Sequence, residues 1–391
     1  LTACGGSDSA STTAAAAGES KAEGESAAAG ESSAAADGAV FKIGGIGPVT
    51  GGAAVYGLAV QHGAEVAVKE INEAGGINGA QIEFQFQDDE HDAEKSVNAY
   101  NTLKDWGMQA LVGTTTSAPC IAVADKTAAD NMFQITPSGS AVECAANPNV
   151  FRVCYSDPAQ GTASAKYIGE HKLASKVAVI YDSSDVYSSG IYEKFAQEAP
   201  NQGLEVVDAE AFTADSNKDF STQLQKAKES GAELVFLPIY YTEASLILAQ
   251  ADSMGFETKF FGCDGIDGIL TKISDKTIVE GLMMLTPFAS DSKEPDVVAF
   301  VGKYKEKYNA DPNQFAADGY DAIYVIKAAI EKAGFSKDNT KDFQKGLVAS
   351  MTQIEVDGVT GTMKWTADGE NNKGAMALVF RDGVAVAFEK K

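Results

Sequence analysis

Small hydroxyl residues and glycines gather in three segments that could hold a negatively charged group. The segments are Gly47–Gly52, Gly113–Ser117 and Pro137–Ser140, and each precedes a stretch that reads as helix. Exposed backbone N–H groups at a helix start, with hydroxyls beside them, bind an anion without Lys or Arg. Ser and Thr at such positions also serve simply as helix N-caps. Because two of these segments follow neighbouring predicted strands, we expect an anion site there, with a carboxylate as the natural ligand.

The second half of the chain carries residues that could hold a positively charged group. Acidic and tyrosine side chains follow three apolar runs, at Asp182–Tyr187, Tyr240-Tyr241 and Cys263–Gly265. A carboxylate beside an apolar strand is costly to bury unless a positive group joins it, and a ligand ammonium would do so. Asp264 before Gly265 also fits an ordinary turn. An anion-accepting half facing a cation-accepting half indicates a zwitterionic ligand.

Alternating strands and helices would position these segments. Two such alternating runs predict an α/β fold with two doubly wound domains, each a parallel sheet covered on both faces. Ligands of such sheets bind beyond the carboxyl ends of the strands, which is where the segments above lie. The predicted strands are 40–46, 82–87, 110–113, 132–136, 176–181, 204–212, 233–238 and 258–262, and the predicted helices are 56–73, 93–106 (capped by Asp92), 189–200, 219–230 and 242–254.

Composition excludes several classes of protein. The 391 residues are 45% hydrophobic, which is enough for two or three domains with real cores. The formal charge of -24 would repel phosphate backbones, and no Lys/Arg-rich run offsets it. No apolar stretch approaches the ~18 residues that span a bilayer. Three histidines and five scattered cysteines are too few for most metal or His-based catalysis, so we expect no enzyme activity, no cofactor and no metal.

The opening residues indicate where the protein acts. Leu1-Thr2-Ala3-Cys4-Gly5-Gly6 is similar to a bacterial lipobox, in which the Cys receives a lipid. Residues 5–38 are almost wholly Ala, Gly, Ser, Thr, Glu and Asp, without Leu, Ile, Val or an aromatic residue. Such a segment cannot offset the entropy cost of ordering, so we expect a flexible tether over 1–38. A lipidated Cys4 followed by a tether is what anchoring of an extracytoplasmic domain requires.

Four further cysteines, Cys120, Cys144, Cys154 and Cys263, could form disulfides. Four cysteines allow three pairings, and the sequence does not choose among them. Cys144 and Cys154 bracket a short segment and could staple it outside the cytoplasm. The alternative is four small buried thiols. We slightly favour one bridge.

Two enzyme classes can be tested against the motifs. In Gly45-Ile46-Gly47-Pro48-Val49-Thr50-Gly51 the last Gly lies one residue too far for G-x-G-x-x-G, and a Pro stands in the middle, so NAD binding is rejected. A Ser hydrolase needs a base near Ser117, but His62 and His171 lie in helical stretches. His91 lies in the acidic run 88–92, where adjacent side chains do not face one metal. We expect that run to be a turn before a helix.

Several short motifs fall in order from about Val40 to the C-terminus. Together they resemble periplasmic binding proteins of the branched-chain amino acid (Leu/Ile/Val-binding) type, which feed ABC importers. The motifs are Ile43–Pro48 with Gly51, Asn72–Gly79, Asp88-Asp89, Ile135–Ser140, Phe151–Val153, Asp219–Ser221, Gly262–Gly265 and Tyr320–Ala322.

The resemblance implies a set of ligand contacts. Asp264 stands where the family has an ammonium-pairing Glu, one methylene longer, and Thr115 and Thr116 replace apolar wall residues, which puts strict Leu/Ile/Val selectivity in doubt. His91 and Thr116 stand where some members have a disulfide. The implied contacts are Ser117, Ser140 and Gly139 for the ligand carboxylate, Ser138 and Asp264 for the ammonium, and Tyr56, Thr115, Thr116, Tyr187 and Tyr240 for the pocket wall.

The resemblance also implies an architecture and a role. We expect a type I periplasmic binding protein fold, with a first lobe of 39–156 plus 288–358 and a second of 157–287 plus 359–391, joined by a three-stranded hinge near 156–158, 286–289 and 357–361. The implied protein is a monomeric, lipid-anchored extracytoplasmic component of an ABC importer. It would capture a small amino acid by lobe closure and deliver it to the permease. The alternative is a ligand-sensing receptor module of the same fold that acts through a membrane partner.

Overall fold

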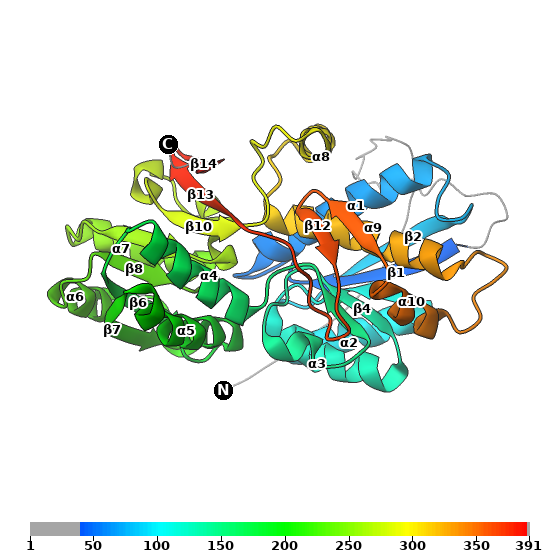
Figure 1. Ribbon diagram of the computed structural model, residues 1–391, viewed down its shortest axis with the longest axis horizontal. Coiled ribbons are helices and arrows are strands. Elements are labelled where there is room, and N and C mark those ends of the chain that lie inside the picture. Colours follow the sequence, from blue (N-terminus) through cyan, green and yellow to red (C-terminus); the bar gives the residue numbers. More distant parts are fainter. Residues whose placement is uncertain (1–39, 389–391) are drawn as a thin grey trace, which may run out of the picture. The chain divides into compact units, whose positions relative to one another are not determined.

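The structure, a computed structural model, describes residues 40–388. Cys4 and the predicted tether therefore lie outside the described residues. Strands and helices alternate over most of this range (Figure 1). The α-helices are α1 (Ala54–Glu73), α2 (Ala93–Trp106), α3 (Ser117–Asp130), α4 (Asp157–Glu170), α5 (Val186–Glu198), α6 (Ser221–Glu229), α7 (Tyr241–Ser253), α8 (Pro295–Tyr308), α9 (Gln314–Ala333) and α10 (Phe343–Met351).

The first sheet has five strands in the order β2-β1-β3-β4-β5, and every pair is parallel. Helices α1–α3 connect its strands, and the late helices α8–α10 pack against α1, α9 and β4. We call these elements together the first-sheet region. The strands are β1 (Val40–Gly47), β2 (Gln81–Asp88), β3 (Ala110–Val112), β4 (Phe133–Thr136) and β5 (Val150–Arg152).

The second sheet has seven strands in the order β14-β13-β10-β9-β8-β6-β7. Strands β6–β10 are parallel, whereas β13 pairs antiparallel with β10 and β14 with β13. With α4–α7 these strands form the second-sheet region. Its strands are β6 (Lys176–Asp182), β7 (Glu205–Phe212), β8 (Leu234–Leu237), β9 (Lys259–Gly262), β10 (Met283–Thr286), β13 (Met376–Arg381) and β14 (Val384–Ala387). The α/β prediction is confirmed, and the antiparallel edge ribbon is an addition to it.

The predicted elements fall on observed ones with shifts at their ends. The side chain of Asp92 accepts the Lys95 N–H and caps α2, as expected. The helix predicted over 189–200 begins earlier, at Val186, because the carboxylate of Asp185 caps it by accepting the N–H groups of Tyr187 and Ser188. It also ends earlier, at Glu198, where a short 3-10 turn follows. Side-chain caps therefore set where both helices start.

Two glycines bring α1 and α9 into close contact. A Cβ on Gly63 would lie 1.8 Å from the Ala316 carbonyl oxygen, and one on Gly319 would lie 2.3 Å from the Val60 carbonyl oxygen. Because glycine has no Cβ, the two helix backbones can lie against each other (Figure 1). This contact ties the late chain segment 314–333 to the first sheet.

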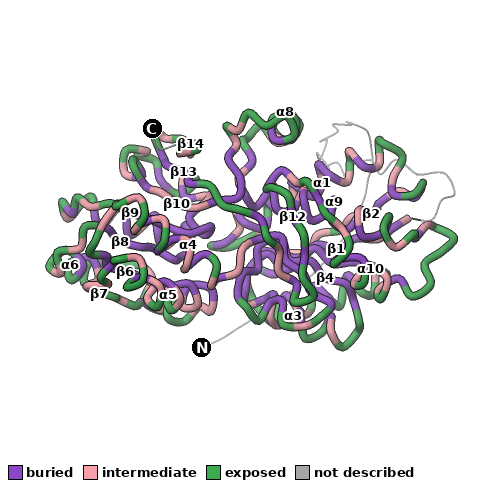
Figure 2. The backbone as a smooth tube through the Cα atoms, in the orientation of Figure 1, coloured by how far each residue is buried: buried purple, intermediate pink, exposed green. Residues whose placement is uncertain are grey.

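Buried residues run through both sheets and through the segments where the two regions meet (Figure 2). Strands β3, β4 and β8 are buried along their whole length, which parallel strands covered on both faces require. The regions therefore share an interface, and it lies at the ends of these strands where the hydroxyl and acidic segments emerge.

The segment after the β11–β12 hairpin packs along β5. The hairpin pairs β11 (Glu355–Gly358) with β12 (Gly361–Lys364). Trp365 Nε1 and Asn371 Nδ2 both donate to the Arg152 carbonyl at 2.9 Å, and the Arg152 N–H donates to the Gly369 carbonyl. Residues 365–371 thus contact the first-sheet region, and the chain joins the second sheet only at β13.

All four cysteines among the described residues are free and buried. The one bridge expected among them is absent, including the possible pairing of Cys144 with Cys154. Cys144 instead packs with Cys120 and Ala141 in a small apolar cluster, and Cys154 directs its sulfur toward the Gly139 carbonyl. The alternative of small buried thiols is therefore correct. Burial raises the pKa values of Cys144, Cys154 and Cys263.

Between residues 40 and 388, no helix combines the length and apolar character that a membrane crossing requires.

Candidate functional site

Most of the predicted ligand contacts converge on one pocket between the two sheets. Ser117 and its neighbours come from the start of α3, Ser138 from the loop after β4, and Asp264 from the loop after β9. Gly139 and Ser140 lie behind this lining and do not face the pocket directly. We call it the inner pocket; its lining residues are Tyr56, Thr115, Thr116, Ser117, Ser138, Tyr187, Tyr240, Asp264, Gly265 and Phe315.

The start of α3 forms the polar wall on the first-sheet side. Thr116 is the N-cap residue of α3, but its side chain makes no capping hydrogen bond. The Ser117 hydroxyl accepts the N–H groups of Ser140 and Ala141 at 3.2 and 3.1 Å. Its own proton is therefore available to an acceptor in the pocket. An uncapped helix start beside a hydroxyl donor is well suited to a carboxylate.

The turn 138–140 is fixed by bonds to its own surroundings. The Ser138 hydroxyl donates to the Thr115 carbonyl, and the Gly139 N–H donates to Thr136 Oγ1 at 2.7 Å. A Cβ on Gly139 would lie 2.7 Å from that Thr136 oxygen, so only glycine fits. The Ser140 hydroxyl is fully buried beside Asp157, and its hydrogen bond partly offsets the rise that burial causes in the pKa of that carboxyl group.

Asp264 forms the acidic wall on the second-sheet side. Its side chain is only 6% exposed, and Tyr187 donates its hydroxyl to Asp264 Oδ1 at 2.6 Å. The same Tyr187 oxygen accepts the Gly265 N–H at 3.0 Å, and Gln160 Oε1 accepts the Asp264 N–H. Burial raises the pKa of Asp264 to about 6, although hydrogen bonds to its carboxylate, that of the Tyr187 hydroxyl first among them, act in the opposite direction. The carboxylate is thus oriented but short of positive charge.

Tyr56 bridges the two regions. Its hydroxyl donates to the Gly265 carbonyl at 2.6 Å and accepts the Tyr241 N–H at 3.1 Å. Further bonds cross the same interface, from the Val55 N–H to the Tyr241 hydroxyl, from Thr242 Oγ1 to the Gly52 carbonyl and from the Gln314 N–H to Asp267 Oδ2. These bonds hold the regions together around an inner pocket of about 10 Å³.

Comparison with known proteins identifies the family and the fold. The sequence model of the family described as "Periplasmic binding protein" matches residues 40–382.

The chain belongs to the periplasmic binding protein family.

Its relatives within that family are amino-acid-binding proteins by name. The "Leucine-, isoleucine-, valine-, threonine-, and alanine-binding protein" of Pseudomonas aeruginosa is 32% identical over 276 residues, which are 70% of this chain and 73% of the relative. The solved leucine-binding protein LivK of Thermotoga maritima has a TM-score of 0.80 at 27% identity, covering 90% of this chain and 98% of that one. LivJ of Streptococcus pneumoniae, solved with isoleucine, has a TM-score of 0.81 at 28% identity over 89% and 99%. This binding protein therefore has a solute-binding role, as its relatives do, and they are not enzymes.

Arg152 supports the turn beside the pocket of this binding protein, and sequence reasoning quoted it only as part of a motif. It is one of two arginines in the chain and is fully buried. Its guanidinium donates to the carbonyls of Gly139 and Ala141 at 3.0 and 3.1 Å and pairs with Glu370 at 2.9 Å. Arg152 therefore holds the turn that carries Ser140 in place. A lone Arg in a strand was the available signal.

His91 lies at the site, which the sequence did not predict. The expected turn is present, with left-handed φ values of 52° at Glu90 and 60° at His91. His91 Nδ1 lies 2.8 Å from Thr116 Oγ1, so a hydrogen bond joins the two positions where some relatives are expected to have a disulfide. The other ring nitrogen lies 3.8 Å from Asp185 Oδ2. Across residues 40–388, no group of three or more His, Cys, Asp or Glu side chains is arranged to hold a metal ion.

Proposed function

We propose that the chain is the extracytoplasmic binding component of an ABC importer and that it captures a small α-amino acid. One observation carries the proposal. A single pocket is lined both by the uncapped start of α3, which bears Ser117, and by Asp264, a buried carboxylate whose charge no positive group of the described chain offsets. The first group suits a carboxylate and the second suits an ammonium. The two groups line one pocket, as the two charges of an α-amino acid would require.

The carboxylate would lie against the first turn of α3. Donors there are the N–H groups of Ser117 and Ala118 and the Ser117 hydroxyl, which already uses its lone pairs on Ser140 and Ala141. Charge-assisted bonds of this kind are about twice as strong as neutral ones, so this wall would supply much of the affinity.

The ammonium would lie between Asp264 and the carbonyl of Ser138. Within the described chain, no hydrogen-bond donor is recorded for that carbonyl. Pairing with a cation would offset the free-energy cost of desolvating Asp264. Without a solute, that cost lowers the stability of the folded protein. Tyr187 and Gln160 would keep the carboxylate aimed at the ammonium.

Entry of the solute would require the two regions to separate. A volume of about 10 Å³ holds roughly one water molecule, so the arrangement described above corresponds to a closed cleft. The two regions would then act as the lobes, with connections near 156–158 and 286–289 and a third at 374–376, where the chain leaves β5 for β13, rather than near 357–361. A solute favours closure only through its higher affinity for the closed form.

The remaining parts of the proposal concern location and delivery. Lipidation of Cys4 would hold the protein at the outer face of the cell membrane through the 1–38 tether. The closed form, as a monomer, would then pass the solute to a membrane permease.

The test is a thermal-shift screen of the full chain against α-amino acids and small carboxylates, followed by titration calorimetry of any hit. We expect at least one α-amino acid to bind, and Ser117→Ala to weaken it at least ~10-fold, because a bond to a charged group is lost. Ser253→Ala, which removes a hydroxyl bonded to Ala249 on α7, is the matched control and should bind normally. If no α-amino acid binds, or if Ser117→Ala binds as tightly as the control, the proposal is wrong.

A further inference from the structure

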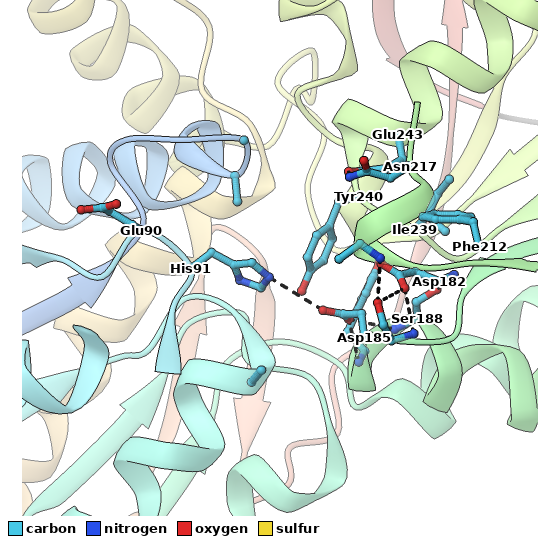
Figure 3. Close-up of a pocket in the computed structure, with 16 residues that line it drawn as sticks. Glu90, His91, Asp182, Asp185, Ser188, Phe212, Asn217, Ile239, Tyr240 and Glu243 are labelled. Atoms are coloured by element: carbon cyan, nitrogen blue, oxygen red, sulfur yellow. Dashed lines mark hydrogen bonds and ion pairs between the residues drawn. The ribbon is translucent and has the colours of Figure 1, made fainter. Parts of the chain in front are cut away.

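A second and larger cavity adjoins the inner pocket. Its volume is about 350 Å³, and Tyr187 and Tyr240 line both spaces. We call it the outer cavity (Figure 3). Both regions contribute to its lining, which consists of Gly52, Ala53, Glu90, His91, Ala118, Asp182, Ser184, Asp185, Tyr187, Ser188, Phe212, Ala214, Asn217, Ile239, Tyr240 and Glu243.

The charged side chains that line the outer cavity are predominantly acidic. Four carboxylates line it, those of Glu90, Asp182, Asp185 and Glu243, whereas no Lys or Arg does and His91 is the one basic side chain in the lining. Figure 3 shows the imidazole of His91 facing Asp185 from the opposite side of the cavity. A solute that reaches this space meets a strongly negative wall.

Three of these carboxylates keep an oxygen that nothing in the chain satisfies well. Asp182 Oδ1 accepts from Ser184, and Glu243 Oε1 accepts from Asn217, but no other residue between 40 and 388 donates to the second oxygen of either. Asp185 Oδ1 caps α5, while its Oδ2 has only His91, 3.8 Å away. Burial raises the pKa values of Asp185 and Glu243. These oxygens can therefore accept donors from a bound molecule.

Tyr240 provides an observation that does not depend on the acidic groups. Its ring packs against Tyr187 at 4.9 Å and meets His91 edge-on at 5.4 Å, yet its hydroxyl bonds to no residue of the described chain. Figure 3 shows that hydroxyl directed toward Asp185 and His91. Tyr240 is partly buried, so this free hydroxyl is available to bond an occupant of the cavity.

We propose that the outer cavity receives the side chain of the solute and that this side chain ends in a cation, so that the solute is a basic α-amino acid with a terminal ammonium or guanidinium group. The inference rests on the proposed function, which places the α-carboxylate and α-ammonium in the inner pocket. Phe212 and Ile239 are buried apolar residues of the same lining, and they would contact the methylene stem. The distal cation would reach the free oxygens of Asp182, Asp185 and Glu243.

The inner pocket is consistent with this class of solute. Thr115 and Thr116 supply hydroxyls where an apolar wall would favour a short aliphatic side chain, and His91 fixes Thr116 in place. The four carboxylates are distributed around the cavity and form no metal cluster. An extended organic cation fits this spread better than a compact ion does.

Calorimetry of the full chain with matched ligands tests the inference. Lysine and norleucine share a four-carbon stem and differ in the terminal ammonium, so we expect lysine, ornithine or arginine to bind at least tenfold tighter than norleucine or leucine, and glutamate to bind weakest. Glu243→Gln and Asp182→Asn should each reduce the lysine-to-norleucine ratio at least threefold. Glu193→Gln, an exposed carboxylate of α5 outside this lining, is the matched control and should leave the ratio unchanged.

The outcomes separate the two proposals. If leucine or norleucine binds as tightly as the basic amino acids, or if both cavity variants keep the wild-type ratio, the assignment of a basic solute is overturned while amino-acid capture stands. If no member of the series binds, both proposals are overturned.

Discussion

Replacing Asp264 by Asn should make the empty protein more stable and the bound complex weaker. Burial raises the pKa of Asp264 from 3.8 to about 6. At about 1.4 kcal/mol per pKa unit, keeping this group ionised in the folded protein costs about 3 kcal/mol. Asn has the same shape and can still accept the Tyr187 hydroxyl, so the variant removes the charge and keeps the hydrogen bond.

The pH dependence of this cost has a definite sign. Below about pH 4 the carboxyl group is protonated in the folded and unfolded protein alike, so it costs nothing. Between about pH 4 and 6 the unfolded chain ionises first, so the folded protein binds more protons and its free energy of unfolding falls as pH rises. The full cost applies above pH 6. Urea unfolding should therefore show Asp264→Asn stabilised by up to about 3 kcal/mol at pH 8 and by little at pH 4.

Binding should change in the opposite direction. Removing one partner of a buried charge pair costs ~2–5 kcal/mol, so calorimetry at pH 8 should show the amino acid bound at least ~30-fold more weakly. Asp208→Asn on β7 is the matched control, because burial raises its pKa to about 6 as well but it does not line the pocket. That control should leave binding unchanged. Unaltered affinity in Asp264→Asn would refute the pairing of this carboxylate with the solute ammonium.

Three further predictions concern the rest of the site. Tyr56→Phe loses both bonds of the bridging hydroxyl, so we expect the ligand-free protein to show a larger radius of gyration in small-angle scattering and the same radius as wild type when saturated with ligand; equal radii without ligand would contradict the bridging role. Arg152→Met should lower the free energy of unfolding by ~3–5 kcal/mol, because the Gly139 and Ala141 carbonyls lose their hydrogen-bond donor and Glu370 loses its ion-pair partner. A urea midpoint within error of wild type would contradict this. Thiol labelling with mass spectrometry should modify the four buried cysteines only after denaturation and without a reductant, whereas a protected pair would indicate a disulfide; they are Cys120, Cys144, Cys154 and Cys263.

Much of the fold could be predicted because its parallel strands are short apolar runs bounded by turns. The predicted strands 110–113 and 233–238 fall on β3 and β8, which are fully buried. Their sequences are short continuous apolar runs and lack the periodicity of an amphipathic helix. The antiparallel ribbon β13–β14 was not predicted, because its pairing with β10 joins residues nearly a hundred positions apart. The contact of residues 365–371 with β5 was not predicted for a similar reason: Trp365 and Asn371 bond to Arg152, and nothing local in the sequence signals that contact.

The site was predictable to the extent that topology determines it. Segments that follow parallel strands must emerge at one edge of each sheet, so Ser117, Ser138 and Asp264 could be brought together from the sequence alone. Their supporting partners could not. Gln160 reaches the backbone of Asp264 from α4, so that contact depends on how distant segments of the second-sheet region pack together. His91 reaches Asp185 across the interface, so that contact depends on how the two regions meet.

A crystal structure of the protein with the tightest-binding amino acid would test the central claim most directly. We predict the α-carboxylate within hydrogen-bond distance of the Ser117 hydroxyl and the first turn of α3, and the α-ammonium within hydrogen-bond distance of Asp264. A solute bound outside the space between the two sheets, or bound there with its charges reversed, would contradict the account.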